Sequence, residues 1–167
     1  VLEHNISSLL MEALQRNLPF ANEQAVFSAL SGLAKMKALW GSLGSPLQAA
    51  LSQSLLETVP AMEVQAVCST LWALGSLGLD WAALDTVGVR RALVDATIRV
   101  SGKLNTQGIS ITLYSLATLD CEYDALPFPL RLSLQAAYLR NSGRAEPREV
   151  AIMLYSWGRM GASVKKG

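Results

Sequence analysis

A fourfold internal repeat is the feature that most constrains how this chain can fold. Four segments share one pattern of apolar, polar and small residues, and they are residues 22–36, 63–77, 105–119 and 146–160. Each segment has a leucine at the same place, and these anchors are Leu30, Leu71, Leu113 and Leu154. The anchors are separated by 41, 42 and 41 residues. Such regular spacing predicts an array of equal structural units.

Within each segment the apolar residues recur at helical spacing. In the second segment Val67, Leu71, Leu74 and Leu77 follow one another by four, three and three residues, which places them on one face of an α-helix. A column of small residues beside this face favours close approach of a second helix, and its members are Ala34, Gly75, Ala117 and Gly158. We therefore expect four helices, called A helices here, near residues 22–37, 63–78, 105–120 and 146–161.

Residues that favour helix ends stand at the limits of these segments. Asn22 and Asn105 are suited to cap helix N-termini, and Pro147 is suited to a first helical turn. Gly78 and Gly161 stand where a helix would end on a residue in the left-handed conformation.

Partner helices, called B helices, are expected between the A helices, near residues 5–18, 46–59, 87–104 and 130–140. No alternating apolar run predicts a strand. Two helices in each unit of about 40 residues are typical of an α-solenoid. We predict an all-α solenoid of stacked helical hairpins with about 41 residues per repeat, forming one array over residues 1–167. We also expect a piece of a longer array, because the last A helix lacks a B partner and would leave Ile152, Leu154 and Trp157 uncovered.

Composition excludes several other classes of protein. The 167 residues are 51% apolar and 16% charged, which is too apolar for a disordered chain. No apolar run reaches the roughly 18 to 20 residues of a membrane-spanning helix. Two cysteines, Cys68 and Cys121, do not make a disulfide scaffold, and their apolar context favours buried thiols in the cytosol or an organelle. The net charge of +1 argues against a strongly basic nucleic-acid protein.

The A-helix motif resembles the octotricopeptide repeat, a helical-hairpin repeat of about 38 to 42 residues. The closest matches are residues 65–78, then 107–119 and 154–161; residues 72–78 read Trp-Ala-Leu-Gly-Ser-Leu-Gly. Related repeats occur in proteins that carry RAP domains. The resemblance implies organellar RNA binding, either to mitochondrial or chloroplast transcripts or to ribosomal RNA. In some algal and protist lineages such proteins are built into mitochondrial ribosomes.

A polar column in the first turn of the A helices is a candidate for reading RNA bases. It consists of Gln24, Gln65, Gln107 and Arg148, and Asn105 lies beside it at the start of the third segment. Amides pair with base edges, and arginine reads or stacks on bases, which suits recognition of one base per repeat. The alternative is that these residues cap helices and face water.

Basic residues gather in the second half of the chain, on or near the expected B helices. They are Arg90, Arg91, Arg99, Lys103, Arg131, Arg140 and Arg144. Residues 1–84 carry a net charge of −3, and residues 85–167 carry +4. These side chains are candidates to neutralise RNA phosphates. The alternative is a solvated helix face.

The aromatic side chains Trp72, Tyr114 and Tyr155 share another column. We expect them to pack between repeats rather than to stack on bases, and we expect Trp40 and Trp81 to pack at the turns. No catalytic constellation surrounds His4, and the cysteines lack the spacing of zinc ligands. We therefore expect no enzyme, no cofactor and no metal site.

Two functions remain open. The first is an RNA-binding helical-repeat protein of organellar gene expression, preferably a mitochondrial ribosome component that contacts ribosomal RNA among neighbouring proteins, with the chloroplast as the alternative compartment. The second is a protein–protein scaffold without RNA contact.

Overall fold

The computed structural model describes the backbone of residues 2–163 and the side chains of residues 6–163. The described residues form nine α-helices and six short 3-10 helices, without strands. The α-helices are α1 (Leu2–Asn17), α2 (Glu23–Lys35), α3 (Ser45–Thr58), α4 (Val64–Ser76), α5 (Trp81–Thr86), α6 (Arg90–Val100), α7 (Thr106–Thr118), α8 (Phe128–Asn141) and α9 (Pro147–Arg159). The 3-10 helices are η1 (Leu18–Phe20), η2 (Trp40–Ser42), η3 (Val59–Ala61), η4 (Ser101–Lys103), η5 (Tyr123–Ala125) and η6 (Ser142–Arg144).

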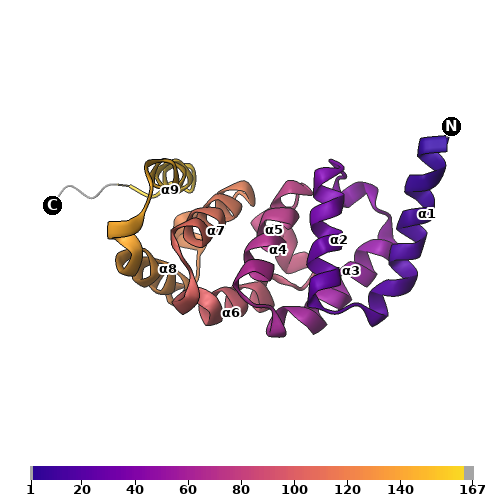
Figure 1. Cartoon of the computed structure of the whole chain (residues 1–167), viewed down its shortest axis with the longest axis horizontal. Coiled ribbons are helices and arrows are strands. Elements are labelled where there is room, and N and C mark those ends of the chain that lie inside the picture. Colours follow the sequence, from indigo (N-terminus) through magenta and orange to yellow (C-terminus); the bar gives the residue numbers. More distant parts are fainter. Residues whose placement is uncertain (1, 164–167) are drawn as a thin grey trace.

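The helices lie in two rows along the length of the molecule (Figure 1). The A row consists of α2, α4, α7 and α9, each in contact with the next. The B row consists of α1, α3, α6 and α8; in Figure 1 α6 and α8 lie below the A row, and α1 stands at the right end of the molecule. Adjacent A helices pack more extensively than adjacent B helices do. The A row is therefore on the inner side of the curve.

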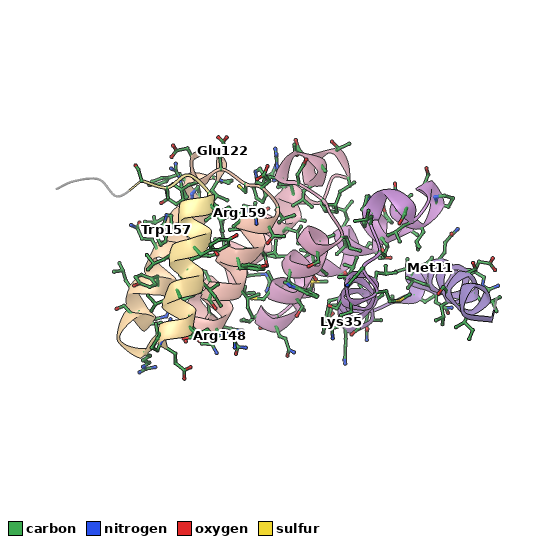
Figure 2. The ribbon with its side chains drawn as sticks, turned by 90° about the horizontal axis from the view of Figure 1, so that it is seen from above. Met11, Lys35, Glu122, Arg148, Trp157 and Arg159 are labelled. Atoms are coloured by element: carbon green, nitrogen blue, oxygen red, sulfur yellow. The ribbon has the colours of Figure 1, made fainter. Side chains whose placement is uncertain are left out.

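The A row also twists along the molecule. Helix α2 is seen lengthwise in Figure 1 and end-on in Figure 2, whereas α9 is seen the other way round. The helix axes therefore turn between the two ends, and the outward side of the A row changes direction with them.

The A helices begin and end within two residues of the sequence prediction. Asn22 caps α2 through a bond from the Ala25 N–H to its Oδ1 (2.9 Å), and Asn105 caps α7 through a bond from the Gly108 N–H (2.8 Å). Pro147 is the first residue of α9. These caps confirm the predicted helix starts, because each amide oxygen satisfies an N–H that the helix leaves free.

The B helices agree less closely with the prediction. Residues 87–104 were expected to form one helix, but α6 covers only Arg90–Val100 and is followed by η4. The short helix α5 is an addition that periodicity did not predict. Its N-cap is Asp80, whose carboxylate accepts a hydrogen bond from the Ala83 N–H at 2.7 Å. Helix α8 starts at Phe128, earlier than expected, because Pro129 is tolerated in a first turn.

Most residues of the predicted apolar columns lie in the core between the two rows. The anchors Leu30, Leu71 and Leu113 are buried. In the small-residue column, a Cβ on Gly75 would lie 3.1 Å from the Thr118 side chain of α7. This distance confirms that a small residue allows α4 and α7 to pack closely.

Exposure differs at the two ends of the A row. Leu154 on α9 is 68% exposed and Gly158 is also exposed, because no helix packs on the far side of α9 in the described residues. Ile152 and Trp157 are half-buried. At the other end Met36 is exposed, although the residues that hold the same place on the other A helices, Leu77, Leu119 and Met160, are buried. Its equivalents are covered by a loop from the preceding hairpin, and α2 has no such loop before it.

Equivalent loops after α2, α4 and α7 each make the same backbone contact with the end of the next A helix. The N–H of Trp40 donates to the Leu77 carbonyl at 2.7 Å, and the N–H of Trp81 donates to the Leu119 carbonyl at 2.6 Å. The N–H of Tyr123 donates to the Met160 carbonyl at 2.8 Å. The acceptors are the residues at the ends of α4, α7 and α9, so each bond joins one hairpin to the next.

All four A helices end on a residue with positive φ. Gly78 and Gly161 have φ of 82° and 77°, as their positions predicted. Lys37 and Asp120 hold the equivalent places with φ of 57° and 54°. For these two residues the left-handed conformation costs free energy, because each carries a Cβ.

Candidate nucleic-acid interface

The outward side of the A row is a surface that we call the A-face. It consists of the residues that each A helix turns away from the B row, spaced by four, three and four positions. They are Gln24, Ser28, Ser31 and Lys35 on α2; Gln65, Ser69, Trp72 and Ser76 on α4; Gln107, Ile111, Tyr114 and Thr118 on α7; and Arg148, Ile152, Tyr155 and Arg159 on α9. None of these side chains is buried, three are basic and none is acidic. The A-face is thus more positive than the chain as a whole.

A groove of about 690 Å³ crosses the A-face between α2, α4 and α7. Amides line it from two neighbouring helices, with Gln65 on α4 and Gln107 and Asn105 at the start of α7. Trp72 and Lys35 border the same groove. No carboxylate lines it. The groove therefore offers hydrogen-bonding amides, one aromatic ring and one cation to a ligand.

The structure brings together part of the predicted base-reading column. Gln65 and Gln107 share the groove, whereas Gln24 is exposed on α2 outside its lining. Arg148 is exposed at the start of α9, away from the groove (Figure 2). The predicted base-reading column thus extends beyond the groove on both sides, and the groove itself contains only two of its four members.

The capping alternative is correct for Asn105, whose Oδ1 accepts the Gly108 N–H. The amide nitrogen of Asn105 has no hydrogen bond within the described residues. Asn105 therefore keeps two free donors at the edge of the groove while its oxygen holds the helix start.

The predicted basic residues lie in the B row and its turns, and most contact other parts of the protein. Arg90 pairs with Asp85 at 3.0 Å, and its guanidinium lies 5.7 Å from the centre of the Trp81 ring. Arg91 is 3.8 Å from Asp95, and both are exposed. An exposed pair of this kind stabilises a helix by only a few tenths of a kcal/mol, roughly 0.3–0.5.

Arg99 and Arg140, which are 41 residues apart, make matching contacts with backbone carbonyls. The Arg99 guanidinium donates to Met62 at 2.6 Å and to Val59 at 3.3 Å, in the turn before α4. The Arg140 guanidinium donates to Ser101 at 2.9 Å and to Leu104 at 3.5 Å, in the turn before α7. Both side chains therefore satisfy carbonyls at the end of the preceding hairpin.

Three further cations from the prediction differ in their surroundings. Lys103 pairs with Glu63 at 2.9 Å, and this partner lowers the pKa of the Glu63 carboxyl through a hydrogen bond and charge attraction. Arg131 is 3.3 Å from Asp124 and lies over the Tyr123 ring. Arg144 is exposed and has no ion pair within the described residues.

Two A-face cations were not predicted as site residues. Lys35 and Arg159 hold the same column in the last turns of α2 and α9, and both are exposed (Figure 2). Neither has an ion pair within the described part of the chain, although Arg159 borders an acidic loop at residues 120–124. The sequence pattern did not identify these two cations as a column, because they are 124 residues apart and the two A helices between them have Ser76 and Thr118 at this position.

The aromatic column is more exposed than expected. Tyr155 is 58% exposed, Tyr114 is 40% exposed, and Trp72 is half-buried at the groove. The expected packing thus applies to only part of the Trp72 ring. Trp40 and Trp81 are buried at the turns, as predicted.

Both cysteines are buried, as their apolar context predicted. Burial raises the pKa of the Cys68 thiol, and it raises the pKa of the Cys121 thiol to about 12. The side chain of His4 lies outside the described residues. In the described part of the chain no group of three or more His, Cys, Asp or Glu is arranged to hold a metal ion. No helix there is both long and apolar enough to cross a membrane.

No family model and no curated protein matches this chain.

Proposed function

We propose that this chain is an α-solenoid of helical hairpins that binds RNA along its A-face. The groove between α2, α4 and α7 carries the proposal, because it gathers Gln65, Asn105 and Gln107 beside Trp72 without a carboxylate. Amide side chains of this kind pair with the edges of bases, and neighbouring helices can each offer one.

Several recurring features support the solenoid and its repeat of about 41 residues. The loop-to-helix hydrogen bonds of Trp40, Trp81 and Tyr123 join three successive pairs of hairpins in the same way. Arg99 and Arg140 bond to equivalent turns. A chain built from stacked equal units makes such contacts at a fixed sequence interval.

In this proposal the first-turn column reads bases. Gln65, Gln107 and Asn105 act in the groove, and Gln24 and Arg148 extend the column to either side. The predicted base-reading residues thus keep their proposed role, with the two groove glutamines at its centre.

Phosphate contacts are assigned first to the A-face cations, which have no ion pair within the described residues: Lys35, Arg148 and Arg159. Most cations of the B row already contact carboxylates or carbonyls, and an RNA phosphate would have to replace those partners. Arg144 has neither an ion pair nor a side-chain hydrogen bond in the described residues, so it stays a candidate for phosphate contact.

The cellular setting follows from the resemblance to octotricopeptide repeats. We propose a mitochondrial ribosome component that contacts ribosomal RNA, with the chloroplast as the alternative compartment. The net charge of +1 supports a role beside other proteins, because few cations remain to bind RNA unaided.

Salt titration of RNA binding, followed by fluorescence anisotropy with a labelled single-stranded RNA, tests the proposal. For single strands each neutralised phosphate contributes about −0.7 to the slope of log K against log salt. The triple variant K35A/R148A/R159A should lower the magnitude of this slope by up to about 2. The charge-matched control R90A/R91A/R99A should leave the slope unchanged. A larger decrease of this slope in the control variant would show that the RNA phosphates bind to the B row instead. Absence of RNA binding by the native chain would refute the proposal.

The amide column needs its own variants. Gln65→Ala with Gln107→Ala should weaken binding and flatten the preference among RNA sequences, since base contacts carry the specificity. Gln15→Ala with Gln53→Ala is the matched control, because both glutamines are exposed on B helices. Equal binding by the two double variants would contradict the reading role.

A protein–protein scaffold is the second candidate. Exposed Leu132, Leu139 and Leu154 on α8 and α9 favour it, because they form apolar surface at one end of the molecule. Association through such surface would scarcely respond to salt, whereas RNA binding would weaken steeply.

A further inference from the structure

We infer that Trp72, Tyr114 and Tyr155 form a stacking surface for unpaired bases, so that the RNA bound on the A-face is single-stranded. This inference rests on the proposed RNA binding and adds the conformation of the ligand and three residues that hold it.

The first argument is the exposure of the rings. Tyr155 and Tyr114 are 58% and 40% exposed, and neither hydroxyl has a hydrogen bond within the described residues. Trp72 packs one side of its ring on the core and borders the groove. Apolar aromatic surface left open on three adjacent helices is available to a planar ligand.

The second argument is the position of the rings on their helices. Each ring follows the first-turn column by seven residues, which is roughly 10 Å along a helix. The cation column of Lys35 and Arg159 follows four residues later, roughly 6 Å further. On α9 the Tyr155 ring thus lies between Arg148 and Arg159, whereas the rings of α4 and α7 follow Gln65 and Gln107 and precede Ser76 and Thr118.

The third argument is charge. The A-face has three cations and no carboxylate, although the chain as a whole has a net charge of only +1. Apolar rings bordered by cations fit a polyanion that also has flat apolar faces. Single-stranded nucleic acid has both, and aromatic stacking binds its bases without regard to sequence.

A duplex does not have these faces available, because its bases are stacked on one another. It would meet the A-face through its phosphates and 2′-hydroxyls, without stacking on the rings. The α2 helix has Ser31 in the aromatic column, so the stacking surface is confined to α4, α7 and α9.

The test compares three variants in the same anisotropy assay. Y114A/Y155A removes the two most exposed rings of the column, and W72F/Y114F/Y155F keeps three aromatic faces. F20A/F128A is the control, because both rings are exposed and lie outside the A-face. Each lost stacking partner should weaken binding about fivefold or more. We expect the alanine double variant to bind at least about 25-fold more weakly, and the phenylalanine variant and the control to bind like the native chain.

The probes are one RNA as a single strand and as a duplex with its complement. The native chain should bind the single strand at least tenfold more tightly. If the native chain binds both forms equally, or if Y114A/Y155A binds the single strand like the native chain, stacking is refuted while RNA binding stands. If the native chain binds neither form, both the inference and the proposed function are refuted. A loss of binding in W72F/Y114F/Y155F equal to that in Y114A/Y155A would refute stacking, because it would show that the two hydroxyls and the indole N–H act rather than the ring faces.

Discussion

Replacing the anchor leucines by alanine tests whether they occupy the same environment in successive hairpins. Leu113 is 4% exposed, so Leu113→Ala removes a fully packed side chain and leaves a cavity. Such substitutions cost about 2–5 kcal/mol in the free energy of unfolding. Leu154 is 68% exposed, so Leu154→Ala loses only about a third of the roughly 1.5–3 kcal/mol that full burial provides.

Thermal unfolding followed by circular dichroism separates these costs. A chain of this size shifts its melting temperature by roughly 2–4 °C for each kcal/mol. We expect Leu113→Ala to lower the melting temperature by about 4 °C or more and Leu154→Ala to lower it by about 1–4 °C. Leu71→Ala should behave like Leu113→Ala. Equal losses at Leu113 and Leu154 would refute the reasoning, because α9 would then be covered in solution.

Three further predictions concern turns, titration and thiols. Lys37→Gly and Asp120→Gly should each raise the free energy of unfolding by about 0.5–1 kcal/mol in urea denaturation, since glycine adopts their positive φ without strain; a loss of stability would show that these side chains make contacts that outweigh the strain. The pKa of Glu63 is lowered by Lys103, so the pair stabilises the fold above the ordinary pKa of a glutamate and this stability is lost as the pH falls through the lowered value. Melting temperatures of the native chain and of Lys103→Ala should thus converge on acidification, and a constant difference would contradict the assignment. Because burial raises the pKa of the Cys68 and Cys121 thiols, iodoacetamide at mildly alkaline pH should alkylate them only after unfolding; rapid reaction of the folded chain would contradict their burial.

The sequence predicted those parts of the fold that depend on local patterns. Asn22, Asn105 and Pro147 mark helix starts because a cap or first turn is decided within four residues. The exposure of Leu154 also followed from the order of the helices. The exposure of Met36 did not, because it depends on a loop that reaches across from a neighbouring hairpin.

The candidate site was only partly predictable for the same reason. Periodicity identified Gln65 and Gln107 as members of one column, but the groove that joins them arises from packing of α2, α4 and α7. The partners of Arg90 and Arg99 come from loops and turns whose paths the repeat pattern does not specify. Tyr155 was expected to pack, whereas its column faces away from the neighbouring helices and leaves the ring exposed.

Ultraviolet cross-linking of bound RNA, followed by mass spectrometry of the protein fragments, locates the interface itself. If RNA binds along the A-face, cross-links should lie within residues 63–77 and 105–119, with Trp72 and Tyr114 among the modified positions. Cross-links confined to α3 and α6, on the opposite row, would contradict binding along the A-face.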